Sequence, residues 1–389
     1  MRPYCVAVTS PTTTVPPTPL LPAYDGACLA NLSPVLLARA DGDRTALPDW
    51  VPEPLSRARQ IVLLVLDGLG MEQLEGRRAL APTIASGTGG PITTVAPSTT
   101  AAALTSLATG LPPAVHGMVG YRVAVGGRVL NVLGWRIGAL DARQQVPPRR
   151  FQPYPCFARA GGVRTPVVSR VDYATTGFSA AHLAGTDLHP WHTPSGVVVE
   201  VRRLLERGER FVYAYYDGID RVSHACGLTE RYDAELRAAD RLVADLLAEL
   251  PPGAVLVVTA DHGQVEVGPS IEVLGGDVMD GVELLSGEGR FRWLHTRPGA
   301  AEDVAAAAAA AFGHVAWVRT LEEMVDEEWL GGEPVPEVAD RLGDVALVPF
   351  APTAFLDPAD TGEQRLVGRH GSLTAAEMLV PLLAFEAAG

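Results

Sequence analysis

Three short apolar runs, each closely followed by an aspartate, restrict the fold of this 389-residue chain more than any other feature. The runs are Ile61 to Leu66 before Asp67, Phe211 to Tyr216 before Asp217, and Ala254 to Thr259 before Asp261. Uninterrupted branched and aromatic residues over such a length are typical of strands that are buried on both faces. We therefore expect three strands in the interior of a sheet.

Helical patterns separate these runs. Thr99 to Ala108 and Glu230 to Leu250 both fit helices, and the second repeats apolar residues at helical spacing, for example Leu236, Ala239 and Val243. Strands that alternate with helices predict an α/β fold with a mainly parallel central sheet. In such sheets, ligands bind beyond the carboxyl ends of the strands, which is where the three aspartates fall.

The sequence after His262 has a different pattern. It predicts strands at Arg290 to Thr296, Val315 to Arg319 and Val345 to Phe350, and helices at Ala300 to Phe312, with Gly313 as the stop, and from Thr320, where Glu323 completes a capping box. We predict that residues 268–350 form a small inserted α/β cap subdomain. Residues 1–267 and 351–389 would then form the catalytic domain, with the main fold resuming near Gly368.

The charge of the chain argues against a nucleic-acid polymer as its partner. Asp and Glu number 45 against 31 Lys and Arg, for a net charge of -14, whereas proteins that bind nucleic-acid backbones are usually basic. A small-molecule ligand remains compatible with this charge. The sequence does not determine the oligomeric state.

Cysteine usage and hydropathy predict a cytoplasmic protein without a membrane span. The four cysteines, Cys5, Cys28, Cys156 and Cys226, show no CxxC spacing and read as free thiols of a reducing compartment. Residues Met1 to Pro22 lack the basic start and apolar stretch of a signal peptide. No apolar run reaches the 18 or more residues of a membrane helix.

Aspartates and histidines beside glycine recur at four separate strand ends or loops. They are Asp67 in LDGLG, Asp220 and His224 in DGIDRVSHACG, Asp261 and His262 in TADHG, and His370 in GRHGS. Any one of them fits a turn residue, a helix cap or a surface pair, but the set in this order predicts a metal site. Carboxylate and imidazole together suit Zn²⁺, or Mn²⁺, better than Ca²⁺ or Mg²⁺. Six such ligands divide into two sets of three, so we expect two divalent ions.

A hydroxyl nucleophile is predicted in the segment Ala96 to Ala103. The helix expected here begins near Thr99 and Thr100, where free backbone N–H groups and the positive end of the helix dipole favour an incoming phosphate. Judged by position alone, Ser and Thr are at least as well explained as helix caps.

Taken together, the motifs resemble those of the alkaline phosphatase superfamily, in particular its type I phosphodiesterase/nucleotide pyrophosphatase family. The resemblance covers Ile61 to Val125, Phe211 to Val267 and Gly368 to Phe385. It includes the signature TGLPPAVHG at Thr109 to Gly117, and counting back from it implies Thr100 as the nucleophile, with Thr99 as the alternative. The implied fold is an alkaline-phosphatase-like three-layer sandwich with a small α/β insertion.

The resemblance also implies roles for the candidate residues. One metal would be held by Asp67, Thr100, Asp261 and His262, and the other by Asp220, His224 and His370. His116 would have a structural role, and Asp217 would hold metal ligands in position without binding the metal itself. The reaction implied is hydrolysis of a phosphate ester through a covalent phospho-threonine, with the two ions stabilising the attacking and leaving oxygens.

Two positions depart from the nucleotide-cleaving relatives. Ala101 and Ala103 stand where those relatives carry an aromatic residue and an Asn. Four arginines are candidate replacement donors to the phosphoryl group, although each also fits a surface ion pair: Arg122, Arg170, Arg292 and Arg369. A phosphodiesterase or nucleotide pyrophosphatase is the leading hypothesis. The alternatives are a phosphomonoesterase or phosphonate hydrolase of the same superfamily, or a non-catalytic relative that binds metal.

Overall fold

The structure, a computed structural model, describes residues 16–360, 362 and 365–387. The expectation that Met1 to Pro22 contains no signal peptide, and the interpretation of Cys5 as a free thiol, fall wholly or mostly outside these residues. Cys28, Cys156 and Cys226 are free, as expected. Among the described residues, no helix is both long enough and apolar enough to cross a membrane.

A seven-stranded sheet forms the centre of the molecule, with the strand order β2-β19-β10-β1-β9-β7-β8. The strands are β1 (Gln60–Leu66), β2 (Thr88–Thr93), β7 (Pro166–Arg170), β8 (Asp187–Trp191), β9 (Phe211–Tyr216), β10 (Ala254–Thr259) and β19 (Leu379–Glu386). The five from β10 to β8 run parallel, whereas β19 pairs antiparallel with both β10 and β2. The prediction of a mainly parallel α/β sheet is confirmed.

The three apolar runs are the adjacent strands β10, β1 and β9. Ile61 lies opposite Phe211 on one side and Val255 on the other, so the strands are closely in register. Every residue of β9 and β10 is buried, and β1 is buried from Ile61 onward. Their carboxyl ends therefore meet at one edge, and this edge gathers the aspartates that follow them.

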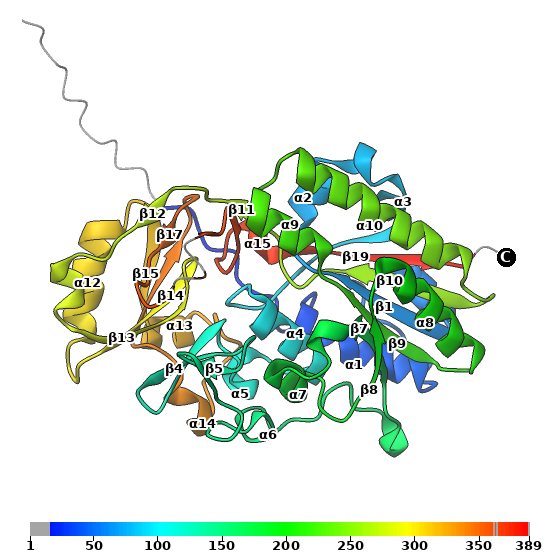
Figure 1. Cartoon of the computed structure of the whole chain (residues 1–389), viewed down its shortest axis with the longest axis horizontal. Coiled ribbons are helices and arrows are strands. Elements are labelled where there is room, and N and C mark those ends of the chain that lie inside the picture. The colour runs from blue at the N-terminus through cyan, green and yellow to red at the C-terminus, as the bar shows by residue number, and fades with distance from the viewer. Residues whose placement is uncertain (1–15, 361, 363–364, 388–389) are drawn as a thin grey trace, which may run out of the picture.

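Helices cover both faces of this sheet (Figure 1). The helices around the sheet are α1 (Leu29–Ala40), α2 (Met71–Glu75), α3 (Pro82–Ala85), α4 (Thr100–Thr109), α5 (Pro113–His116), α6 (Pro148–Phe151), α7 (Gly177–His182), α8 (Pro194–Glu206), α9 (Gly218–Cys226), α10 (Glu230–Ala248) and α15 (Ala375–Met378). Helix α10 buries the expected apolar stripe, including Leu236, Ala239 and Val243. The three-layer arrangement agrees with the fold class predicted from the sequence.

A second, four-stranded sheet lies to one side of the main sheet, in the order β13-β14-β16-β15 (Figure 1). Its elements are β13 (Val282–Glu288), β14 (Phe291–Thr296), β15 (Ala316–Thr320) and β16 (Val345–Pro349), with helices α11 (Gly276–Met279), α12 (Ala301–Phe312), α13 (Leu321–Asp326) and α14 (Pro336–Ala339). It shares an apolar cluster with α12, built from residues such as Leu294, Val304 and Leu347. The assignment of 268–350 as an inserted cap stays a prediction.

Local patterns in this region predicted most elements to within one residue. Thr320 and Glu323 form the expected capping box, in which each side chain accepts the other's backbone N–H, at 3.2 and 2.8 Å. Strand β13 was not predicted, since its sequence VELLSGE lacks a strict alternation. Short strands β3 (Arg122–Val125), β4 (Arg128–Asn131), β5 (Arg136–Ile137) and β6 (Leu140–Asp141) form another unpredicted sheet. Two-residue pairs complete the sheets: β11 (Val265–Glu266) with β18 (Gly368–Arg369), and β12 (Ile271–Glu272) with β17 (Ala354–Phe355).

Candidate active site

Acidic and imidazole side chains from the ends of β1 and β10, from helix α9 and from the loop after β18 converge at the carboxyl edge of the central sheet. Asp67 directly follows β1, and Asp261 with His262 follows β10. Asp220 and His224 lie one turn apart on α9, and Nε2 of His224 is 3.2 Å from Oδ1 of Asp220. This short distance arises because residues four apart on a helix share a face.

His370 reaches the same place along a different route. It follows β18, and β18 pairs antiparallel with β11, which lies just after His262. The His262 and His370 rings stack with centroids 3.4 Å apart. A residue more than a hundred positions away in the sequence is thus brought to the ends of β1 and β10.

These residues form two groups, each with three ligand atoms within 4.8 Å of one another. One group is Asp67, Asp261 and His262, and the other is Asp220, His224 and His370. The division is the same as the one that the family resemblance implied. Binding of metal by either group stays a prediction.

The three histidines are oriented by backbone carbonyls. Nδ1 of His224 lies 2.7 Å from the Gly368 carbonyl, that of His262 lies 2.9 Å from Gly263, and that of His370 lies 3.0 Å from Ser98. Because a carbonyl only accepts, each Nδ1 carries a proton, which leaves Nε2 as the ring nitrogen that can bind a metal ion. Such outer hydrogen bonds are typical of metal-binding histidines.

The Nε2 lone pairs face other acceptors. Nε2 of His262 is 3.4 Å from Oδ1 of Asp67 and 3.4 Å from Oδ2 of Asp261, and neither buried oxygen has a hydrogen-bond donor among the described residues. In the second group, the Nε2 atoms of His370 and His224 lie 3.3 Å apart. Facing acceptors without a donor are unfavourable in a buried site, and a cation between them removes the conflict. Both groups therefore fit a metal ion.

Burial and neighbouring charges shift the pKa values of Asp67 and His370 so that both groups favour their uncharged forms. Burial raises the pKa of Asp67 well above its ordinary value, and the nearby carboxylates of Asp261 and Asp220 raise it further. Burial also lowers the pKa of His370, with a further contribution from His262 and His224. Without a cation, Asp67 tends toward protonation and His370 toward neutrality, as expected for a desolvated site.

Two supporting side chains were missed by the sequence analysis. The Tyr215 hydroxyl donates to Oδ2 of Asp67, and Nε2 of Gln264 donates to Oδ1 of Asp220 at 2.6 Å. The sequence offers one weak signal for each residue. Tyr215 lies in the apolar run before the loop that leads to Asp220, and Gln264 directly follows the TADHG motif. Which carboxylate each would reach depends on strand pairing.

Thr99 and Thr100 have different roles at the start of α4. Thr99 is the N-cap, and its side chain accepts the Ala102 N–H at 3.4 Å. Thr100 is the first helical residue, and its Oγ1 lies 3.1 Å from Nε2 of His262. Capping therefore falls to Thr99, which leaves the Thr100 hydroxyl directed at the Asp and His groups.

The structure also locates the two residues for which a supporting role was expected. His116 is buried away from both groups, between the Ser106 hydroxyl at 2.8 Å and the Met118 N–H at 3.0 Å, and burial lowers its pKa to about 3. This setting agrees with a structural role. Asp217 is the N-cap residue of α9 and accepts from the Tyr173 hydroxyl at 2.5 Å. None of the bonds described for Asp217 reaches a candidate ligand.

For three of the four candidate arginines, the interpretation as surface ion pairs is wrong. Arg122, Arg292 and Arg369 are all buried. Arg122 forms ion pairs with Asp357 and Asp360, and Arg292 donates to the carbonyls of Ser286, Gly287 and Phe355. Arg170 pairs with Asp172 and Asp217. Arg369 lines a cavity together with Thr100.

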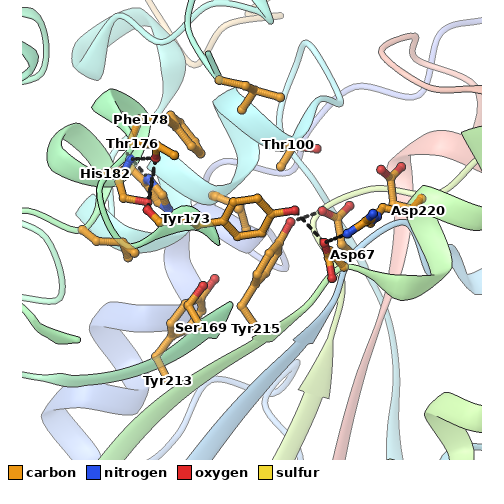
Figure 2. A pocket seen from close by; sticks show the side chains of 16 residues that line it. Asp67, Thr100, Ser169, Tyr173, Thr176, Phe178, His182, Tyr213, Tyr215 and Asp220 are labelled. Atoms are coloured by element: carbon orange, nitrogen blue, oxygen red, sulfur yellow. Dashed lines mark hydrogen bonds and ion pairs between the residues drawn. The ribbon is translucent and has the colours of Figure 1, made fainter. Parts of the chain in front are cut away.

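Two cavities adjoin Thr100. The first has a volume of about 140 Å³ and extends from Asp67 and Asp220 toward Phe178 and His182 (Figure 2). The second, of about 250 Å³, is lined by residues that include Ala101, Tyr121, Glu288 and Arg369. Both leave open space beside the Thr100 side chain.

The parallel α/β sheet, the two groups of Asp and His at its carboxyl edge and the adjacent threonine define an alkaline-phosphatase-like hydrolase of phosphate esters. The model of the type I phosphodiesterase/nucleotide pyrophosphatase family matches residues 61–373, which is more than half of the chain. The chain belongs to this family, as its motifs predicted. Comparison with curated proteins found no match.

Solved structures support the fold. Murine ectonucleotide pyrophosphatase/phosphodiesterase 5 aligns with a TM-score of 0.63 at 16% identity, covering 84% of this chain and 87% of that chain. An inactive variant of the same murine protein, in complex with AMP, aligns equally well, with a TM-score of 0.63. Phosphonoacetate hydrolase from Sinorhizobium meliloti 1021, in complex with phosphonoformate, aligns with a TM-score of 0.61 at 21% identity, covering 87% and 90% of the two chains.

Proposed function

We propose that the chain is a two-metal hydrolase of small phosphate esters, of the phosphodiesterase/nucleotide pyrophosphatase type, with Thr100 as nucleophile. The observation that carries the proposal is the position of the Thr100 hydroxyl, 3.1 Å from Nε2 of His262 and beside two groups of facing acceptors. A site that only bound metal would have no need of a hydroxyl placed at this point.

Two divalent cations, Zn²⁺ or Mn²⁺, would be held by the two groups of side chains. Asp67, Asp261 and His262, with the Thr100 hydroxyl, would bind one ion. Asp220, His224 and His370 would bind the other. Bound in this way, the ions supply Lewis-acid stabilisation of the attacking and leaving oxygens.

The chain itself supplies a nucleophile in a fixed position. Oγ1 of Thr100 attacks phosphorus, and the bond from phosphorus to the alcohol oxygen breaks. The alcohol leaves with the proton that the Thr100 hydroxyl gives up, and the phosphoryl group is left on the threonine. Water then hydrolyses this ester, which releases the phosphate product and restores the hydroxyl. The start of α4 holds Thr100 in place, since Thr99 caps the helix one residue earlier.

The proposal is tested with the full chain, purified in the presence of Zn²⁺ or Mn²⁺. The panel consists of a nitrophenyl phosphate monoester, a nitrophenyl phosphodiester, a nitrophenyl nucleotide ester and phosphonoacetate. We expect the diester or the nucleotide ester to be cleaved fastest. A strong preference for the monoester, or for the carbon–phosphorus bond of phosphonoacetate, contradicts the diesterase assignment.

The role of Thr100 is tested separately. Thr100→Ala should lower kcat on the best substrate by at least about 1,000-fold, because the covalent route is lost. Bound metal should be retained, and it is measured by elemental analysis. Retained turnover would remove Thr100 from the mechanism, and a native protein that binds both ions but cleaves no member of the panel would favour a binding protein.

A further inference from the structure

Ser98, two residues before Thr100, is bonded through each of its polar atoms to the loop that carries His370. Its backbone carbonyl accepts from Nδ1 of His370 at 3.0 Å. Its backbone N–H donates to the Gly371 carbonyl at 3.1 Å. Its hydroxyl donates to the Ser372 carbonyl at 2.6 Å and accepts the Gly371 N–H at 3.2 Å. Ser98 is 0% exposed, so these bonds are shielded from bulk solvent.

The two side-chain bonds of Ser98 require a hydroxyl. One atom has to donate to a carbonyl and accept from an N–H at the same time, and Ser and Thr carry such an atom on a short side chain. Removal of the hydroxyl takes a donor from the Ser372 carbonyl and an acceptor from the Gly371 N–H, both in a buried place. Loss of such partners in the interior is unfavourable, so the hydroxyl holds the two segments together.

Gly371 allows the loop to lie close to both Ser98 and the second sheet. Its φ is 131°, in the region that favours glycine. A Cβ at this position would lie 3.1 Å from Cγ of Glu288 and 3.3 Å from Cβ of Arg290. A larger residue would therefore push the loop away from the turn between β13 and β14, which gives the second glycine of the GRHGS motif a physical reason.

The other side of this loop is held by the second sheet and by α15. The Ser372 hydroxyl donates to the carbonyl of Pro349, at the end of β16, at 2.5 Å. The Ser372 N–H donates to the Glu377 carboxylate at 3.1 Å, and Glu377 pairs with Arg290 at 2.6 Å. Because the loop is fixed on this side, the bonds from Ser98 determine how it lies against the segment that leads to Thr100.

Ser98 also directly precedes the start of α4. The N-cap Thr99 follows it, and Oγ1 of Thr100 lies 3.1 Å from Nε2 of His262. Of the bonds that the structure describes for Ser98, none reaches Asp67, Asp261 or His262. Ser98 is therefore connected directly to one group of candidate ligands and not to the other.

We infer that Ser98 is a positioning residue, which holds His370 and its partners Asp220 and His224 in a fixed place relative to Thr100. The inference rests on the proposed function, which assigns a metal ion to these three ligands and the attack on phosphorus to Thr100. Ser98 itself neither binds metal nor transfers a proton. A serine with a purely structural role would affect both groups of ligands alike, whereas a positioning residue affects the His370 group alone.

The test measures the zinc affinity of each group separately, in the full chain, by competition with a chromophoric chelator. Asp261→Ala leaves the His370 group as the intact site, and His224→Ala leaves the group of Asp67, Asp261 and His262. In Asp261→Ala, the added Ser98→Ala should weaken zinc binding by about 10- to 100-fold, as is usual when an outer partner of a ligand is lost. In His224→Ala, it should change zinc affinity by less than about threefold. Equal changes in the two backgrounds, or no change in either, overturn the inference.

Ser33→Ala is the matched control. Ser33 is 1% exposed, and its hydroxyl donates to the Leu107 carbonyl on α4, the helix that begins with Thr100. The control thus loses a buried serine bond to the same helix, and zinc affinity should stay within about threefold in both backgrounds. Selective weakening in Ser33→Ala as well would mean a general loosening of α4 and would overturn the inference. If Ser98→Ala does not fold, Ser98→Cys replaces it, because a thiol is only a weak donor, and the same outcomes apply.

Failure of this inference is distinguishable from failure of the proposed function, because the titrations require no turnover. With zinc at saturation, kcat of Ser98→Ala should also fall at least about tenfold while KM stays within about threefold, since Thr100 no longer keeps its place relative to His370. A chain that cleaves diesters through Thr100 but shows no selective change in zinc affinity loses only the positioning role of Ser98. A chain that shows the selective change but cleaves no substrate keeps that role and loses the proposed reaction.

Discussion

The Tyr215 hydroxyl donates a hydrogen bond to Oδ2 of Asp67, between the end of β9 and the residue after β1. Both side chains are buried. Burial and the nearby Asp67 and Asp261 carboxylates raise the pKa of Tyr215, so the phenol keeps its proton and remains a donor. The bond leaves Oδ1 of Asp67 directed toward His262. A tyrosine in the middle of the sheet thus orients a candidate metal ligand.

Tyr215→Phe should weaken binding of one zinc ion by about 10- to 100-fold, as is usual when the outer partner of a metal ligand is lost. Zinc affinity is measured by competition with a chromophoric chelator. Tyr216→Phe is the matched control, because its hydroxyl bonds to Glu235, which belongs to neither group of candidate ligands. Equal zinc affinities for the two variants contradict a specific role for the Tyr215–Asp67 bond.

Removal of metal should destabilise the protein, because the acceptors of both groups then face one another without a cation. Zinc present at about 100 times its dissociation constant should add about 2.7 kcal/mol for each independent site. Thermal unfolding is compared before and after dialysis against a chelator, and again after zinc is restored. A melting temperature that does not change with zinc argues against both sites.

The two threonines at the start of α4 should separate stability from turnover. Thr99→Ala removes the N-cap and should lower the free energy of unfolding by about 1 kcal/mol with little change in kcat. Thr100→Ala should change stability by less than about 0.5 kcal/mol, because Thr100 makes no cap bond, while turnover is lost. Urea unfolding and steady-state rates are measured on both variants. The opposite pattern would make Thr99 the nucleophile.

A buried ion pair connects the second sheet to the loop that carries His370. Arg290, in the turn between β13 and β14, bonds to Glu377 at 2.6 and 2.9 Å, and Glu377 also accepts the Ser372 N–H at 3.1 Å. Arg290→Met leaves a buried carboxylate without its cation and should cost about 3–5 kcal/mol. Arg319→Met is the control, since the Arg319–Glu327 pair is partly exposed and should contribute below about 1 kcal/mol. Similar losses of unfolding free energy would show that the burial of Arg290 has no energetic role.

The stability of the protein should fall with pH below neutrality, in part through His116. The folded-state pKa of His116 is lowered to about 3 by burial, below the ordinary value near 6.5. The unfolded chain therefore binds a proton as pH falls through 6.5 while the folded protein does not, and stability is lost between these values. At pH 5 the loss from His116 should be about 2 kcal/mol relative to pH 7. Urea unfolding at both pH values, in the native protein and in His116→Gln, checks this: an equally steep fall in the variant excludes His116 as a source.

Local sequence patterns predicted many of the elements and the six candidate ligands, and the family resemblance implied how the ligands divide into two groups. The three six-residue apolar runs are buried strands, and the parallel pairing of β1 with β10 places Asp67 and Asp261 at the same sheet edge. The four-residue spacing of Asp220 and His224 places both on one helix face in the same way. These are short-range consequences of strand and helix geometry, so one sequence was enough to predict them.

The sequence alone therefore determined the family, the central sheet, and the three loops and one helix that carry the candidate ligands. Tertiary structure decided the rest: which carbonyl orients each histidine, that Tyr215 supports Asp67, that Thr99 rather than Thr100 is the cap, and that Arg290 reaches Glu377. Apart from the cap and the His262–Gly263 contact, each of these contacts joins segments far apart in the chain. Their partners depend on strand order and loop paths, which no local periodicity encodes.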